Sequence, residues 1–264
     1  MNRLLTPEAK ESLLAAWHRE KGLSGNALKM IACFFMFFDH MSQGVALNNS
    51  GFMPTGVTTS WGIPVLWGIP TASLLATLTT MAGRIAFPIF CFFLVQGVLL
   101  TGDYKKQIQR LLLFAVLSEV PFDLGLFGQA VYWGHQNVLF ELALGAATIV
   151  GLKKIADGSI KRKKIWSIVL FIITALFAEF LAFDYGASGI IAMVLFYLVF
   201  NNRRRTMLMG LVGFLFEAPF YGTVYLSLPL IYQYNGKRGR GGRWFFYIFY
   251  PAHLLALYLL SLWI

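Results

Sequence analysis

Residues 28–47 read LKMIACFFMFFDHMSQGVAL, a stretch of twenty residues that is mainly apolar but contains Lys29, Asp39 and His40. A bilayer core of about 30 Å requires roughly 20 apolar residues in an α-helix. The stretch is therefore predicted to span a membrane, with an Asp-His pair in its second half.

Apolar stretches of this kind recur along all 264 residues, of which 58% are hydrophobic and 13% charged. Soluble domains carry roughly 25% charged residues, so the fold class predicted is an all-α polytopic membrane protein. Nine spans are expected, at about 28–47, 82–100, 107–125, 135–152, 165–183, 186–200, 206–221, 223–234 and 244–263. The eighth is short and contains Pro229, so a distorted helix is expected there. Glycines and prolines interrupt a further apolar segment, 63–80, which is predicted to be re-entrant or interfacial on the outer side.

Positive charge indicates the orientation of these spans. With the N-terminus inside, 21 of the 22 Lys and Arg residues fall before the first span, in inner loops or at their edges. This is the positive-inside pattern, and it predicts a cytoplasmic N-terminus and an extracytoplasmic C-terminus. It also explains the net charge of +10 without nucleic-acid binding. Arg84 is the single exception.

The first 23 residues are predicted to form a separate amphipathic helix on the membrane surface. Thr6 and Pro7 resemble an N-cap and a first helical residue, and Leu13, Leu14 and Trp17 then alternate with charged residues. The segment lacks the continuous apolar core of a signal peptide. Residues 24–264 form the transmembrane domain in this interpretation.

Acidic residues concentrate within the apolar helices or at their outer ends. An ionisable group in hydrocarbon is costly and normally faces a polar cavity or a partner, so a lined cavity is predicted. Its members would include seven carboxylates, Arg84 and three histidines: Asp39, Glu119, Asp123, Glu141, Glu179, Asp184, Glu217, Arg84, His40, His135 and His253. Asp39 and His40 lie near the midplane, where a histidine beside a carboxylate favours proton transfer.

Several of these residues have a structural alternative. Arg84 either serves the cavity or pairs with Glu119 or Asp123 as a lock between helices. His135, Gln136 and Asn137 either cap the fourth span or bind a polar acceptor. His253, after Pro251, is either a substrate ligand or a satisfied structural histidine. Glu179 and Glu217 are expected to be solvated. No metal-ligand spacing such as HExxH occurs.

The ordered set of motifs resembles the TraX family across residues 24–258. The resemblance rests on residues 28–32 leading to Asp39 and His40, and then on GRIAFPIF (83–90), SEVPFD (118–123), HQN (135–137), DYG (184–186), YNGKRG (234–239) and YPAH (250–253). The family's named activity is acetylation of a conjugative pilin N-terminus from acetyl-CoA. The chain is also distantly similar to transmembrane acyltransferases of the acyltransferase-3 type, in which a histidine of the first helix is the base.

The resemblance implies an acetyltransferase of the bacterial cytoplasmic membrane, surrounded by lipid. His40 would be the general base and Asp39 or another nearby carboxylate would orient it, while acetyl-CoA would bind at Lys105, Lys106, Arg110, Lys237 and Arg238. The RxxR pair of acyltransferase-3 enzymes is not reproduced, because Lys106 and Arg110 are four residues apart. An extracytoplasmic acceptor (a peptide amine, a glycan or a lipid) would enter beside Arg84, Glu119, Asp123, His135, Gln136, Asn137, Asp184, Tyr185 and His253.

Two other functions fit the same residues. A proton-coupled transporter would use the buried Asp, Glu and His side chains as a relay. A noncatalytic assembly factor of a surface machine is the other alternative, but it would give Asp39 and His40 no functional role.

Overall fold

The computed structural model describes residues 4–48, 78–100, 102–217 and 222–263, and these form ten α-helices, one 3-10 helix and no strand. The prediction of an all-α chain is confirmed for this part of the sequence. The helices are α1 (Pro7–Trp17), α2 (Gly25–Asn48), α4 (Ala86–Leu100), α5 (Tyr104–Phe127), α6 (Val138–Asp157), α7 (Lys163–Phe180), α8 (Gly186–Val199), α9 (Arg203–Gly213), η1 (Gly222–Leu226), α10 (Ser227–Tyr232) and α11 (Arg243–Ser261).

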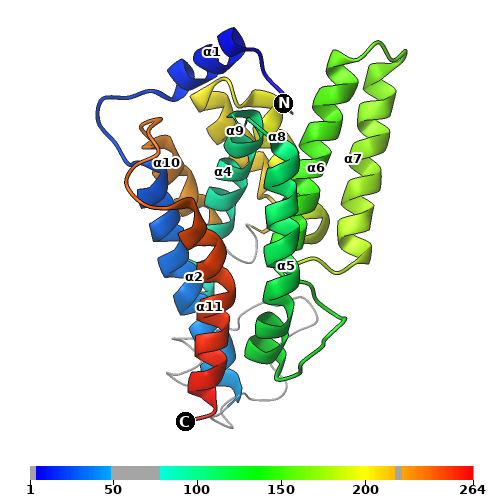
Figure 1. Ribbon diagram of the computed structural model, residues 1–264. Coiled ribbons are helices and arrows are strands. Elements are labelled where there is room, and N and C mark those ends of the chain that lie inside the picture. Colours follow the sequence, from blue (N-terminus) through cyan, green and yellow to red (C-terminus); the bar gives the residue numbers. More distant parts are fainter. Residues whose placement is uncertain (1–3, 49–77, 101, 218–221, 264) are drawn as a thin grey trace.

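The long helices run side by side as a bundle around α4 (Figure 1). α4 packs against α2, α6, α8 and α10, and α5 packs against both α6 and α11. Large side chains of α4, including Ile89, Phe92 and Val95, are fully buried. A helix that is apolar on every side is buried on every side, so α4 forms the core of the bundle.

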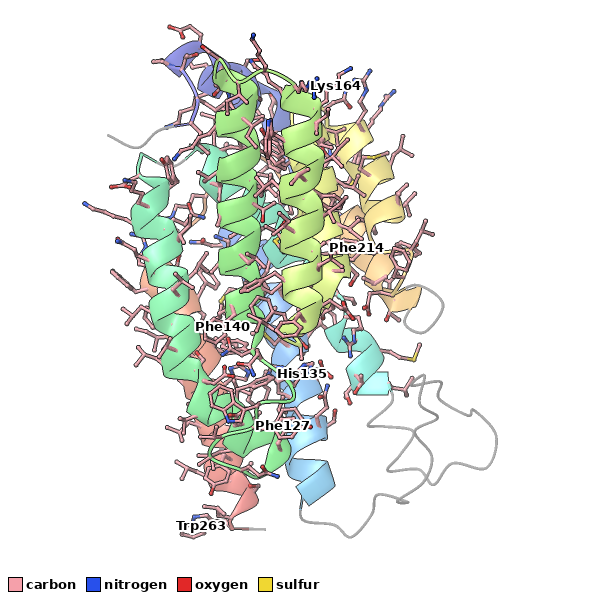
Figure 2. All side chains as sticks on the ribbon, turned by 90° about the vertical axis from the view of Figure 1, so that its right-hand side faces the viewer. Phe127, His135, Phe140, Lys164, Phe214 and Trp263 are labelled. Atoms are coloured by element: carbon pink, nitrogen blue, oxygen red, sulfur yellow. The ribbon has the colours of Figure 1, made fainter. Side chains whose placement is uncertain are left out.

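The two ends of the bundle differ in charge. Lys164 lies at one end and Trp263 at the other (Figure 2). The N-terminal region lies at the Lys164 end and the C-terminus at the Trp263 end (Figure 1). The Lys164 end is called the basic end below.

Two segments, Leu78–Leu100 and Trp244–Ser261, are long and apolar enough to cross a membrane. Both correspond to predicted spans, and the other seven predicted spans also overlap helices. Nine membrane crossings are not established, because several of these helices are short or charged. The exposed face of α7 is nonetheless apolar, with Ile168, Ile172 and Leu176 all more than 45% exposed.

The eighth segment is distorted, as Pro229 and its length predict. It divides into η1 and the six-residue α10, which contains the proline. Most of the predicted re-entrant segment 63–80 lies outside the described residues. In addition to the ten named helices, residues 78–83 are helical, and a turn at Arg84 and Ile85 joins them to α4.

α1 begins as predicted, since the Thr6 hydroxyl accepts a hydrogen bond from the Ala9 N–H and Pro7 is its first residue. The contacts of its apolar side chains differ from the predicted contacts with lipid. Leu13 and Trp17 are buried against the bundle, and the Trp17 Nε1–H donates to the Phe200 carbonyl over 2.8 Å. Leu14 alone of the three stays exposed. The expected lipid-facing side of α1 therefore mainly contacts protein.

Candidate functional site

A cavity of about 250 Å³ opens between α2, α4, α5, α11 and the segments that precede α6 and α8. Apolar side chains such as Met36, Phe90 and Phe122 form part of its wall. Its polar lining contains six of the predicted site residues: Asp39, His40, Arg84, His135, Asp184 and Tyr185. These residues come from four distant parts of the sequence, which the fold brings to one place.

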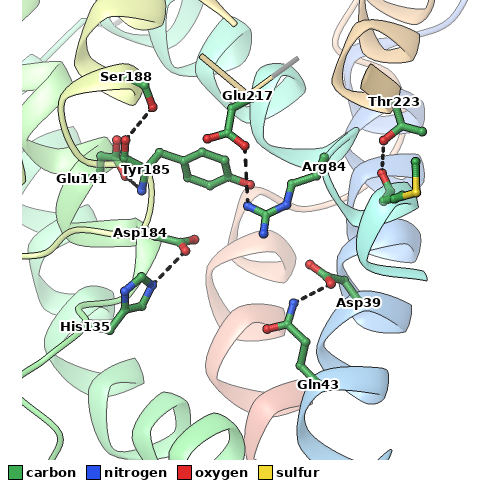
Figure 3. A network of polar contacts seen from close by, with 11 residues as sticks. Asp39, Gln43, Arg84, His135, Glu141, Asp184, Tyr185, Ser188, Glu217 and Thr223 are labelled. Carbon is green, nitrogen blue, oxygen red and sulfur yellow. Dashed lines mark hydrogen bonds and ion pairs between the residues drawn. The ribbon is translucent and has the colours of Figure 1, made fainter. Parts of the chain in front are cut away.

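Arg84 extends across the space between Asp39 on α2 and the turn that contains Asp184 and Tyr185 (Figure 3). Its Nη1 lies 4.0 Å from the Glu217 Oε2, and its guanidinium lies 5.5 Å from the centre of the Tyr185 ring. The expected solvation of Glu217 is wrong, because its side chain is only 19% exposed and forms this pair.

The alternative partners proposed for Arg84 are engaged elsewhere. Glu119 accepts a hydrogen bond from Asn137, and Asp123 accepts one from the Tyr132 N–H over 2.7 Å. Neither carboxylate lines the cavity. The prediction of a lock between Arg84 and α5 is therefore wrong, because the loop before α6 binds both α5 carboxylates.

The residues of the HQN motif have separate roles. Asn137 is fully buried, and its side-chain oxygen accepts from the Leu139 N–H as the N-cap of α6. The Gln136 amide donates to the Trp133 carbonyl. His135 lines the cavity, where its Nε2 lies 3.1 Å from the Asp184 carboxylate. Capping thus explains Asn137, and His135 alone of the three reaches the cavity.

Asp39 and His40 are adjacent in sequence but bind different partners. The Asp39 Oδ1 accepts from the Gln43 amide over 2.6 Å, one helical turn away. The His40 Nδ1 lies 2.8 Å from the Nε2 of His253. The side chain that contacts the His40 imidazole is therefore a histidine, and the expected orienting carboxylate binds Gln43 instead.

Glu141 was predicted to line the cavity, but it lies outside the lining and instead holds the turn of Asp184 and Tyr185 in place. Its side chain is fully buried, and its Oε2 accepts from the Tyr185 N–H over 2.8 Å. The Tyr185 ring in turn stacks on Phe87, with 3.6 Å between ring centroids. Glu141 lies one helical turn after the N-cap Asn137, and its place within an apolar helix correctly indicated that it faces inward.

Gly189 provides the space for the Glu141 carboxylate. A Cβ at position 189 would overlap the Glu141 side chain and would also contact the Phe87 ring. We expect Gly189→Ala to lower the free energy of unfolding by about 2 kcal/mol, because a packed interior does not absorb an added methyl group. Thermal unfolding in detergent measures the effect. Gly222→Ala is the matched control, since a Cβ there meets nothing within 4 Å; equal melting temperatures for the two variants would contradict the packing argument.

The predicted donor-binding residues lie at the basic end, away from the cavity. Lys105 and Lys106 are exposed in the first turn of α5, and Arg110 is half-buried one turn later. Lys237 and Arg238 are exposed in the loop before α11. This loop is held in place, because the carbonyls of Lys237 and Arg238 accept the N–H groups of Gly25 and Asn26, over 2.8 Å each, at the start of α2.

Comparison with known proteins gives matches over most of the chain. A family described as "TraX protein" matches residues 24–261. The chain is also 30% identical over 210 residues, covering 66% of its length, to a protein of Dichelobacter nodosus named "Probable fimbrial assembly protein FimC, serogroup H1", of which it covers 79%. No solved structure matches. α1 lies outside the matched region, whereas every cavity residue lies inside it.

Proposed function

The chain belongs to the TraX family, and on that premise we propose that it is an acyl-CoA-dependent membrane acetyltransferase. It would transfer an acetyl group from cytoplasmic acetyl-CoA to an amine or hydroxyl that enters from the outer side. The observation that carries the proposal is the placement of His40, which lines a polar cavity inside an otherwise apolar bundle. The name of the D. nodosus relative favours an acceptor associated with a pilus or fimbria, and a surface glycan or lipid is the other acceptor class.

His40 is the general base in this proposal. The acceptor nitrogen or oxygen bonds to the thioester carbonyl carbon while its proton passes to the imidazole. The C–S bond then breaks, and the CoA sulfur takes the proton from His40. Arg84, which lines the same cavity, would stabilise the negative charge that develops on the carbonyl oxygen.

The donor would approach from the basic end. CoA carries several negative phosphate charges, and Lys105, Lys106, Arg110, Lys237 and Arg238 supply positive charge where α5 and α11 begin. His40 lies 14 residues beyond Asn26 on α2, roughly 21 Å along the helix axis. An extended pantetheine arm between α2, α5 and α11 would cover such a distance.

A proton relay, as in a transporter, receives less support from the same residues. His253 contacts His40 on one side, and its Nδ1 lies 2.8 Å from the Phe249 carbonyl oxygen on the other. A backbone carbonyl has no proton to pass on, so the chain of hydrogen bonds ends there. This termination suits a base that is held in one orientation.

Acetyl-CoA is expected to raise the melting temperature of the purified protein, because a ligand that binds only the folded state stabilises it, by about 2.7 kcal/mol at 100 times its Kd. Pantetheine, which lacks the nucleotide phosphates, should stabilise much less. Replacing Lys237 and Arg238 by Gln should weaken the effect of acetyl-CoA. Replacing Lys161 and Lys164 by Gln is the control. Lys164 lies in the first turn of α7 and Lys161 just before that helix, and α7 and α11 lie on opposite sides of the bundle (Figure 1). Absence of any shift with acetyl-CoA would contradict the proposed donor and favour a transporter or an assembly factor.

A further inference from the structure

His253 lies behind His40, away from the cavity. It is 5% exposed and does not line the cavity, whereas His40 does. The two imidazole rings are nearly parallel, with 10° between their planes and 5.1 Å between their centroids, and they meet edge to edge through the His40 Nδ1 and the His253 Nε2. Phe249 stacks on His253 with 4.6 Å between centroids. Both rings of the pair are therefore held in one orientation.

The hydrogen-bond partners determine which ring nitrogens carry protons. The Phe249 carbonyl can only accept, so the His253 Nδ1 must be the donor over their 2.8 Å separation. In a neutral imidazole the other nitrogen is then an acceptor. The His253 Nε2 therefore accepts from the His40 Nδ1 over 2.8 Å, which makes Nδ1 the protonated nitrogen of His40.

The geometry points to His253 as a positioning residue that holds His40 in the tautomer with a free Nε2 lone pair. Nε2 is then the basic nitrogen of the one ring of the pair that lines the cavity. When Nε2 accepts a proton, the Nδ1–H bond to His253 persists and helps to stabilise the charged ring. A neutral histidine thus has the orienting role that a carboxylate has in many His-based sites.

Pro251 lies between His253 and the carbonyl that it binds. Proline lacks an N–H and clashes with the carbonyl four residues earlier, so the helix is locally perturbed within the YPAH motif. Phe249 and His253 are one helical turn apart on the same face. The acceptor Phe249 immediately precedes the YPAH motif (250–253) and the donor His253 ends it, so the bond that fixes the His253 tautomer spans the motif.

The tautomer itself is measurable by ¹⁵N NMR of the full chain labelled at histidine. The chain has four histidines, and single substitutions assign each ring. At neutral pH we expect His40 to show a protonated Nδ1 and a bare Nε2. In His253→Ala the two tautomers should mix, and in His253→Gln the amide oxygen should accept from Nδ1 and restore the original state. His18→Ala, at the exposed end of α1, is the control and should leave the His40 signals unchanged.

The consequence for catalysis rests on the proposed function and is tested separately. His253→Ala should lower kcat about 100-fold with the KM for acetyl-CoA changed by less than about twofold, and His253→Gln should recover most of the rate. A protonated Nε2 on His40 in the unsubstituted protein, or an unchanged tautomer in His253→Ala, would overturn the assignment. If the unsubstituted protein transfers no acetyl group, the proposed function fails, and the NMR result still decides the role of His253.

Discussion

His40→Ala should reduce acetyl transfer by about 10²- to 10⁴-fold, the range that general acid–base catalysis contributes. Among the described residues two imidazoles line the cavity. Alanine removes that of His40, and the other, that of His135, is paired with Asp184. The measurement is incubation of membranes with labelled acetyl-CoA, followed by identification of the labelled product and its rate of formation.

Two further variants separate a chemical loss from a structural one. His18→Ala removes an exposed histidine at the end of α1 and should leave the rate unchanged. His40→Gln keeps a side chain that can bond to His253 but supplies no base, so it should be as inactive as His40→Ala while melting near the unsubstituted protein. Full acetyl transfer by purified His40→Ala would show that His40 is not the base.

The hydrophobic pattern predicted the helices of the bundle well because the length of an apolar stretch can be read directly from the local sequence. Every predicted span overlaps a helix, and the distortion at Pro229 follows from its missing N–H. The place of α1 was less predictable. Trp17 has the same spacing whether its partner is lipid or protein, and only the folded chain brings the Phe200 carbonyl within 2.8 Å of its indole.

The candidate site was predictable in composition but not in pairing. Costly ionisable residues within apolar helices indicated a cavity, and six of the predicted residues do line one. The spacing of residues along one helix does not determine which side chains of another helix they contact. His40 therefore has a partner 213 positions away, and Arg84 pairs with Glu217 and not with the carboxylates of α5.

Arg84→Met should lower the free energy of unfolding by about 3 kcal/mol, the cost of removing one member of a buried ion pair. The guanidinium lies among three carboxylates, those of Asp39, Asp184 and Glu217, within a largely buried site. Methionine keeps much of the side-chain length and removes the charge. The carboxylates would then face one another without the cation, and acetyl transfer should fall as well.

The pairing with Glu217 predicts that the two positions are energetically coupled. Arg84→Met combined with Glu217→Gln should be less destabilised than the sum of the two single variants, because each single change leaves the other charge without its partner, whereas the double change removes both charges. The exposed pair of Lys153 and Asp157, four residues apart on α6, is the matched control, and its removal should cost no more than about 0.5 kcal/mol. Chemical denaturation of the singles and the double measures both pairs. If the changes in the free energy of unfolding at Arg84 and Glu217 are strictly additive, the two side chains are not coupled. The guanidinium would then act on the cavity through Asp39 and Asp184, and its proximity to Glu217 would not contribute to stability.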